Sequence, residues 1–349
     1  MVAGVTQAVA AARRFADEVL FPDAMRVDRL DVLPVAHLDA LAARGLWGAA
    51  APREAGGLGL SLPELSAVAE EIAGGCLATA FVWIQHLRLL TTLALGPAPA
   101  ALRDRWLEPA CRGTLRGGIA LTGLMPGPPL LRAKPVAGGW RLDGAAPWVT
   151  GWGLIDLVVV VARGPDDTVV TVIMDAAAQP GLTVSRQRLS AVDASVTVRL
   201  GFDGVLIPVD RFISQVPFDP AASVHPEALR VNGSLALGLV GRCCRMIGPS
   251  TLDDELAACR NRLDDTLAAD PDAMAGARAA AAELAVRATA ALAVWDGSKS
   301  ITVDQHAQRL AREAVFLLVF GSRPAIKRAL LGRLGVLPED DLRQPVRNP

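Results

Sequence analysis

The chain contains no tyrosine, only four histidines, and aromatic residues at 4% of its 349 positions. Its five cysteines, at positions 76, 111, 243, 244 and 259, show no Cys-x-x-Cys spacing and no accompanying histidine cluster. A zinc site is therefore not expected, and no other metal site is predicted. An odd number of cysteines in a chain without a signal peptide is typical of reduced, mostly buried thiols.

No charge of one sign dominates, because 35 basic residues face 36 acidic ones, so nucleic acid is not an expected partner. The mean hydropathy is +0.34, yet apolar runs such as Leu157 to Ala162 have only the length of a buried strand. A membrane span needs roughly 18 residues, and none is predicted. Arg13 and Arg14 follow the first apolar stretch instead of preceding it, unlike a signal peptide. We expect a cytoplasmic protein.

Residue patterns divide the chain into four parts. We predict an N-terminal helical domain at 1–114, a central β-domain at 115–218, a C-terminal helical bundle at 219–336 and a tail at 337–349. In the first part, Ser61 is expected to cap a helix that begins at Leu62, and another helix is expected at about 77–95. The run Phe21-Pro22-Asp23 is expected to end the first helix.

The central and C-terminal parts differ in the spacing of their apolar residues. Segments between Gly117 and Phe202 are rich in Val and Ile and are broken by Gly, Pro and Asp, which predicts a compact antiparallel barrel or sandwich. From Pro226 onward, four helices and a short terminal helix are expected. The third, from Pro271 to Trp295, is apolar almost all round, which is typical of the middle of a bundle or of a subunit contact.

Three short motifs follow one another along the chain: Ala120-Leu121-Thr122, Trp148-Val149-Thr150, and Arg312-Glu313-Ala314 leading to Phe320-Gly321. In this order, and with the β-rich segment around the first two, they resemble the acyl-CoA dehydrogenase family over roughly residues 25–335. The resemblance implies an acyl-CoA dehydrogenase-like α+β fold: a helical N-terminal domain, a central β-barrel or sandwich, and a C-terminal four-helix bundle. It also implies FAD, bound between the helices and the β-domain.

The resemblance assigns cofactor-binding roles to Thr122, Trp148 and Thr150. In the family the matching threonines hydrogen-bond the flavin ring and the matching tryptophan packs against it. Such donors suit a flavin because reduction places negative charge on one edge of the ring. The alternative is that Trp148 belongs to the barrel core and that both hydroxyls satisfy local backbone groups.

The family's catalytic base does not match. The family carries Tyr-Glu-Gly-Thr, whose glutamate removes the substrate α-proton, where this chain has Phe320-Gly321-Ser322-Arg323. Gly321 thus occupies the position of the base. Glu227 is a possible substitute, with a solvated first-turn carboxylate as the alternative. His86 follows a helix that lines the acyl cavity in the family and is a candidate substrate contact, and His306 is a candidate at the mouth of the site or a helix-surface residue.

Two further segments depart from the family. After Ala-Leu-Thr the family continues Glu-Pro-x-x-Gly-Ser-Asp, whereas residues 123–129 here are Gly-Leu-Met-Pro-Gly-Pro-Pro. The prolines remove backbone donors that could hold a thioester or diphosphate. Gly248-Pro249-Ser250 is expected to shorten the first C-terminal helix, and the Arg-x-x-Phe-Gly motif that reaches the FAD pyrophosphate in the family is absent from the sequence.

Three functions remain open at this point. The first is a flavin-dependent oxidoreductase that acts on an acyl thioester, of CoA or of an acyl-carrier protein. The second is a non-catalytic subunit in a heteromer with a complete acyl-CoA dehydrogenase, and the third is a hydroxylase that uses reduced flavin and oxygen. The apolar third helix of the bundle also predicts self-association, as a homodimer or such a heteromer.

Overall fold

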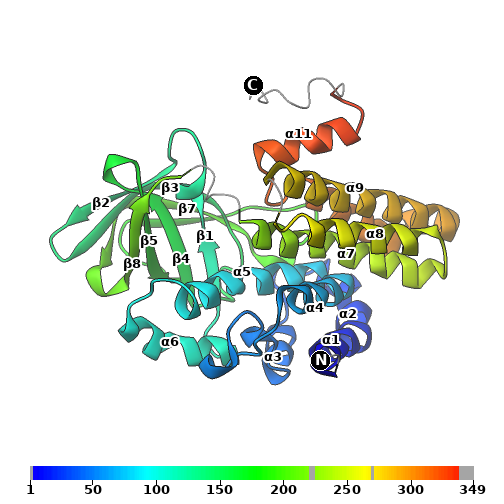
Figure 1. Cartoon of the computed structure of the whole chain (residues 1–349), viewed down its shortest axis with the longest axis horizontal. Helices are drawn as coiled ribbons and strands as arrows, with labels where there is room; N and C mark the ends of the chain where they lie inside the picture. The colour runs from blue at the N-terminus through cyan, green and yellow to red at the C-terminus, as the bar shows by residue number, and fades with distance from the viewer. Residues whose placement is uncertain (1–2, 220–224, 269–270, 338–349) are drawn as a thin grey trace.

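The computed structural model describes residues 3–219, 225–268 and 271–337, of which residues 3–6 and 271 are described by backbone alone. Figure 1 shows three parts: helices at the N-terminus, a central β-domain, and a second set of helices near the C-terminus. This confirms the predicted α+β, acyl-CoA dehydrogenase-like architecture. The boundaries at 114, 218 and 336 remain predictions; the predicted tail at 337–349 lies, except for residue 337, outside the described residues.

The N-terminal helices are α1 (Ala3–Phe15), α2 (Phe21–Val27), α3 (Val35–Ala43), α4 (Leu62–Gly75), α5 (Leu77–Ala94) and α6 (Ala100–Arg112). At the start of α4, the Ser61 N–H donates to the Glu64 carboxylate across 2.6 Å, which confirms the predicted cap. The expected end of the first helix at Phe21-Pro22 is wrong. A π-helical turn, Ala16–Leu20, leads directly into α2, where Pro22 sits in the first turn and needs no intrahelical acceptor.

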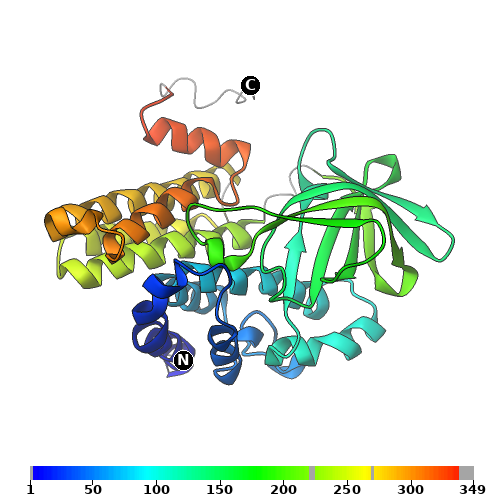
Figure 2. The ribbon, with the colours of Figure 1, turned by 180° about the vertical axis from the view of Figure 1, so that it is seen from behind.

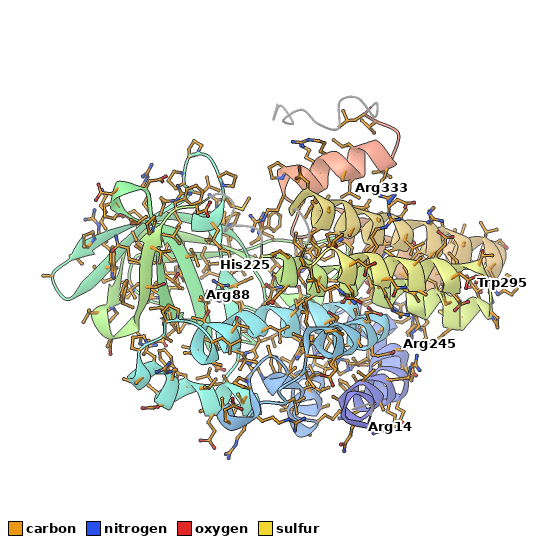
Figure 3. All side chains as sticks on the ribbon, in the orientation of Figure 1. Arg14, Arg88, His225, Arg245, Trp295 and Arg333 are labelled. Carbon is orange, nitrogen blue, oxygen red and sulfur yellow. The ribbon has the colours of Figure 1, made fainter. Side chains whose placement is uncertain are left out.

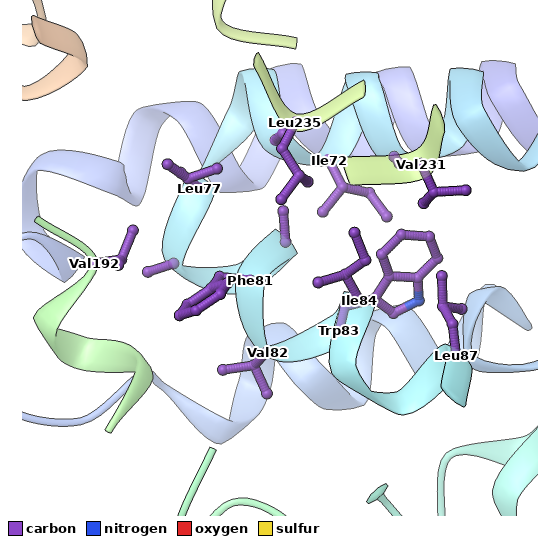
Figure 4. Close-up of a cluster of buried hydrophobic side chains, with 14 of the residues drawn as sticks. Ile72, Leu77, Phe81, Val82, Trp83, Ile84, Leu87, Val192, Val231 and Leu235 are labelled. Atoms are coloured by element: carbon purple, nitrogen blue, oxygen red, sulfur yellow. The ribbon is translucent and has the colours of Figure 1, made fainter. Parts of the chain in front are cut away.

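The core of the helical half lies between α4, α5 and α7 (Pro226–Ile247). Ile72, Leu77, Trp83 and Leu235 are all essentially inaccessible to solvent, and Figure 4 shows these side chains meeting in one cluster. By length and composition α5 could cross a membrane, but 83% of it is buried inside the fold. A core helix of a globular protein meets the same criteria, so α5 is best described as the central helix of this part.

The β-domain is an eight-stranded sheet with the order β6-β7-β3-β2-β4-β5-β8, and β1 pairs with β4 outside that path. The strands are β1 (Gly117–Ala120), β2 (Leu131–Val136), β3 (Gly139–Val149), β4 (Leu157–Arg163), β5 (Thr168–Asp175), β6 (Leu182–Arg186), β7 (Val198–Pro208) and β8 (Phe212–Pro217). The expected antiparallel arrangement holds for most strand pairs, but β4 pairs in parallel with β1 and, at one position, with β2. The long connection through β2 and β3 lets the chain return in the same direction.

The C-terminal helices are α7, α8 (Thr251–Asp265), α9 (Pro271–Asp296), α10 (His306–Val319) and α11 (Pro324–Arg333). As predicted, Gly248 ends α7; its φ of +95° is one that glycine adopts readily. Helix α9 contacts α7, α8, α10 and α11, which cover most of its apolar length, but Val294 and Trp295 at its end are 82% and 65% exposed. The predicted bundle is confirmed, and the exposed end of α9 remains compatible with a subunit contact.

Candidate functional site

The turn after β1 carries Thr122, which is 8% exposed, in the short helix η4 (Thr122–Leu124). Its neighbour Gly123 packs directly on β4. A Cβ atom at position 123 would lie 2.6 Å from the carbonyl carbon of Ala162, so only glycine permits this approach. This contact gives a physical reason for glycine at a position where the family has glutamate.

Arg163, at the end of β4, holds the same turn in place. Its Nε donates to the Gly123 carbonyl across 3.2 Å, and its Nη2 donates to the Met125 carbonyl across 3.0 Å. The guanidinium is buried, pairs with Asp167, and lies 3.4 Å from the centre of the Phe218 ring. Sequence analysis missed this residue, because nothing in a strand ending in arginine indicates which carbonyls it will reach.

Trp148 and Thr150 occupy the end of β3, where the strand pairing is irregular. The register between β3 and β7 shifts between Ala146 and Val149, which is a β-bulge of the kind that redirects side chains beside binding sites. As a result Val149 is fully buried, while the Trp148 side chain is 62% exposed. The core interpretation of Trp148 is therefore wrong: its indole ring is available to a ligand.

Thr150 is 3% exposed, and its hydroxyl meets a second one that sequence analysis missed. Thr150 Oγ1 lies 3.1 Å from Thr197 Oγ1, and Thr197 Oγ1 lies 3.4 Å from Ser195 Oγ. The alternative, in which the Thr150 hydroxyl only satisfies local backbone groups, is wrong, because its partner Thr197 is a side chain 47 residues away. The run Asp193-Ala-Ser-Val-Thr was the only signal in the sequence, and it is too short to be specific.

Gly321 lies in the turn between α10 and α11, with a φ of +61°. A Cβ atom there would sit 3.4 Å from Nδ2 of Asn232 on α7, so the place of the family's base faces a neutral amide. Arg323 in the same turn contacts the Met125 thioether. The turn after α10 and the turn after β1 are thus in contact, and the fold brings together two motifs that are far apart in the sequence.

An aromatic cluster lies behind this turn. Phe81 of α5 meets Phe316 and Phe320 edge to face, with ring centroids 5.1 and 5.0 Å apart, and the latter two rings stack at 5.7 Å. Such pairs stabilise by about 0.5–1.5 kcal/mol each beyond their burial. The cluster fixes the end of α10 against α5, immediately before Gly321.

His86 is a structural residue. It is fully buried, its Nδ1 accepts the Gly117 N–H across 2.9 Å, and its Nε2 lies 3.1 Å from the Ala110 carbonyl oxygen. Because Gly117 N–H is the donor, the ring proton is on Nε2 and both ring nitrogens have backbone partners. Burial lowers the pKa of His86 to about 3, which keeps the ring neutral. The predicted substrate contact is therefore replaced by a role in joining α5, α6 and β1.

The other two candidates are placed as follows. His306 stacks on Phe21 at a centroid distance of 4.0 Å, and burial beside Arg309 and Arg242 lowers its pKa to about 4. It packs between α10 and α2, about 22 Å along α10 from Gly321 at 1.5 Å per residue, and is neither at the mouth of the site nor a free surface residue. Glu227 is exposed in the first turn of α7, which fits the solvated alternative.

A basic residue and a histidine lie where the three parts of the fold meet. Figure 3 places Arg88 of α5 and His225, the residue before α7, at the junction between the β-domain and the C-terminal helices. Burial lowers the pKa of Arg88, and burial together with nearby Arg88 lowers the pKa of His225. Arg88 Nε has no hydrogen-bond partner within the described ranges. The junction therefore favours neutral or anionic ligand groups.

A separate groove has a volume of about 450 Å³. Its lining comes from α3, the α6–β1 turn and the β3–β4 loop, and includes Asp39, Arg116 and Asp156. Arg116 is already engaged there by the Asp39 carboxylate, across 2.6 Å. Thr122, Trp148 and Thr150 do not line this groove, so its size says nothing about the candidate site.

Comparison with known proteins finds similarity to one group of enzymes. Residues 5–114 match the N-terminal domain of acyl-CoA dehydrogenases. The chain is similar to acyl-CoA dehydrogenases. It is 29% identical over 234 residues to the benzylmalonyl-CoA dehydrogenase of Aromatoleum aromaticum, covering 65% of this chain and 62% of that enzyme. It is 27% identical over 215 residues to the human mitochondrial short-chain specific acyl-CoA dehydrogenase, covering 58% and 51%.

One of the similar proteins is named for a reaction other than dehydrogenation. A 3-sulfinopropanoyl-CoA desulfinase of Paraburkholderia xenovorans is 28% identical over 214 residues, covering 58% of this chain and 54% of that protein. The matched region thus spans less than two thirds of these relatives. Sequence similarity on this scale does not distinguish among their reactions.

Solved structures confirm the fold over almost the whole chain. The butyryl-CoA dehydrogenase of Megasphaera elsdenii superposes with a TM-score of 0.82 at 17% identity, covering 96% of this chain and 98% of that one. An FAD complex of PigA superposes with a TM-score of 0.81 at 18% identity, with the same coverage. At these identities the comparison establishes the fold of this acyl-CoA dehydrogenase relative and nothing finer.

Proposed function

We propose that the chain binds FAD at the end of β3 and acts as a flavin-dependent oxidoreductase on an acyl thioester. One observation carries this proposal: a β-bulge at the end of β3 leaves the Trp148 indole exposed, and the buried Thr150 lies two residues further along the chain. An exposed aromatic face suits a planar ring, and the hydroxyls of Thr150 and Thr122 suit its polar edges. The residues present therefore fit FAD, which when bound supplies hydride acceptance. The FAD complex of PigA, with the same fold, supports this proposal.

The absorbance spectrum of the purified protein tests flavin binding directly. A yellow protein with flavin bands, or a colourless one that takes up FAD stoichiometrically, is the expected result. A colourless protein that does not take up added FAD would overturn the proposal. Trp148→Ala should weaken FAD binding. Trp295, an exposed tryptophan at the end of α9 (Figure 3), provides the matched control, and Trp295→Ala should leave FAD binding unchanged.

The proposed substrate is an acyl thioester of CoA or of an acyl-carrier protein. The relatives named above act, by their names, on CoA thioesters. The missing carboxylate at Gly321 means that the protein itself supplies no base at the family position. Turnover of acyl-CoA with an artificial electron acceptor is therefore expected to be slow, since a positioned base contributes about 10²–10⁴-fold. Glu227 is the residue to mutate if turnover is fast.

A second candidate, a non-catalytic subunit paired with a complete acyl-CoA dehydrogenase, is favoured by the contact between position 321 and Asn232. It predicts a stable complex with such a partner and activity that resides in the partner's site. Oxygen-dependent hydroxylation by a flavin-loaded, dehydrogenation-inactive protein would instead support the third function. We also propose that the chain resides in the cytoplasm, where its five buried free cysteines stay reduced.

Self-association remains a proposal, and the exposed apolar residues Val294 and Trp295 at the end of α9 support it. Light scattering is expected to give a mass above that of the 36.5 kDa chain. A homodimer would give twice the chain mass, and a heteromer would appear only with the partner present. A mass of one chain at micromolar concentration, together with no co-purifying partner, would overturn the proposal.

A further inference from the structure

The segment before β7 is strained. Val192 has a φ of +55° and Val196 a φ of +50°, flanking the short helix η6 (Asp193–Ser195). Both are β-branched residues in the left-handed region, where such side chains are genuine outliers. Backbone strain of this kind costs on the order of 1–3 kcal/mol per residue and tends to occur at functional sites.

The rest of the fold holds this strained segment from several sides. The Leu33 N–H donates to the Ala194 carbonyl across 2.7 Å, and the Gly151 N–H donates to the Ser195 carbonyl across 2.9 Å. Figure 4 shows Val192 lying beside α5 near Leu77 and Phe81, and Figure 2 shows the segment reaching from the β-domain across the helices. The segment is therefore fixed relative to both the N-terminal helices and the end of β3.

The segment places the hydroxyls of Ser195 and Thr197 next to that of Thr150, so that the three form a row. These residues are 0%, 2% and 3% exposed. Three hydroxyls joined by two hydrogen bonds contain three hydrogens, so one hydrogen is left over, on Ser195, Thr197 or Thr150. If Thr150 donated to Thr197 and Thr197 to Ser195, the left-over hydrogen would be on Ser195. Within the described residues Ser195 Oγ has no other hydrogen-bond partner, and leaving a buried donor unpaired costs about 1–3 kcal/mol.

A left-over hydrogen on Thr197, which is 2% exposed, would cost the same. A left-over hydrogen on Thr150, which is 3% exposed, is equally unpaired in the protein alone but can be donated to a ligand at the proposed flavin site. Ser195 then donates to Thr197, Thr197 donates to Thr150, and the left-over hydrogen is on Thr150 at the end of β3. The separations of 3.1 and 3.4 Å are longer than the usual 2.7–2.8 Å. The row is thus arranged to present Thr150 as a donor.

We propose that Thr197 is a positioning residue: it donates to Thr150 and thereby aims the Thr150 hydroxyl, as a donor, at an acceptor atom on the edge of the bound flavin. This role rests on the proposed flavin site. Thr197 does not itself touch the ligand, and Ser195 sets the direction of the row.

FAD titration of purified protein tests the proposal through five variants, one of them a double variant. Thr197→Val removes only the hydroxyl and should weaken FAD binding about three- to tenfold, the effect of losing one net hydrogen bond. Thr197→Ser restores the hydroxyl and should return the affinity close to wild type. Thr150→Val should weaken binding similarly, and adding Thr197→Val to it should have no further effect, because Thr197 acts only through Thr150. Thr289→Val, which removes a buried hydroxyl bonded to the Val286 carbonyl on α9, is the control and should not change the affinity.

The results of these titrations distinguish a failure of the proposed Thr197 role from a failure of the proposed flavin site. If the wild type binds FAD but Thr197→Val binds equally well, the role of Thr197 is overturned and the flavin site stands. Multiplying effects of Thr197→Val and Thr150→Val, or no recovery in Thr197→Ser, would assign Thr197 a structural role only. If the wild type binds no FAD, the proposed function fails, and the role of Thr197 fails with it.

Discussion

Nη2 of Arg278 on α9 donates to the carbonyl oxygen of Leu317 on α10 across 3.1 Å. Leu317 belongs to the last turn of α10, whose carbonyls lack intrahelical partners. Arg278 is 2% exposed, and burial lowers its pKa to about 10, still far above neutral pH. A buried cation therefore caps the helix that ends just before the Phe320–Arg323 turn, and the position of that turn depends on a residue of another helix.

Replacing Arg278 should loosen this turn. Arg278→Met leaves the Leu317 carbonyl without its donor, so we expect a loss of about 1–3 kcal/mol in the free energy of unfolding and faster amide exchange at residues 320–323. Arg287→Met on the same helix removes an exposed arginine paired with Glu255 and Glu283 and should change stability by no more than about 1 kcal/mol. Urea unfolding and hydrogen exchange measure both. Equal effects of the two variants would contradict the capping role.

Trp148 and Trp140 lie on the same strand and should respond oppositely. Trp148→Ala should leave stability nearly unchanged, because the ring is 62% exposed, but weaken FAD binding by roughly 1–3 kcal/mol by analogy with base stacking. Trp140→Ala should destabilise the fold by about 3–5 kcal/mol, because that ring is buried and stacks on Phe212 at 5.8 Å. Thermal unfolding and FAD titration separate the two effects. Unchanged FAD affinity in Trp148→Ala would count against the proposed site.

Gly321→Glu tests whether only the base is missing. If the site is otherwise intact, the carboxylate should raise α,β-dehydrogenation of acyl-CoA above the wild-type level, within the 10²–10⁴-fold range of a general base. The φ of +61° at this position means that any side chain is strained, at about 1–2 kcal/mol. Gly321→Gln carries the same strain without the base and is the matched control. Activity that stays at background in both, with flavin bound, would indicate that substrate geometry is lost as well.

His86 should make the fold sensitive to acid. Burial lowers its pKa in the folded protein to about 3, below the ordinary value of 6.5 that applies after unfolding. The unfolded chain therefore binds more protons between these values, so this contribution is fully present above pH 6.5 and is lost as the pH falls toward 3. His306, with a folded pKa of about 4, acts in the same direction.

The measurement is the free energy of unfolding as a function of pH. The wild type should lose stability more steeply below pH 6.5 than His86→Gln, which cannot titrate. That variant should also be less stable at pH 7, since it breaks the bonds to Gly117 and Ala110. Parallel pH profiles for wild type and variant would show that His86 is not the group responsible.

Much of the fold could be predicted because local signals agreed with it. Ser61 with Glu64 marked a helix start, Gly248 marked a helix end, and Val- and Ile-rich runs marked the β-domain. These signals depend on residues within a few positions of one another, which sequence reveals directly. The first helix was an exception, because a π-turn let α2 continue where Pro22 predicted an end.

The sequence by itself determined which residue types stand at the candidate site: a glycine at 321 where a base is expected, and two threonines with a tryptophan in family order. The tertiary structure decided what those residues can do. It exposed Trp148 through a bulge, enclosed His86 between two backbone partners, and brought Ser195 and Thr197 to Thr150. Burial, strain and hydrogen-bond partners arise from contacts between segments 30 to 200 residues apart, as from His86 to Gly117 or from Met125 to Arg323, and no local pattern encodes them.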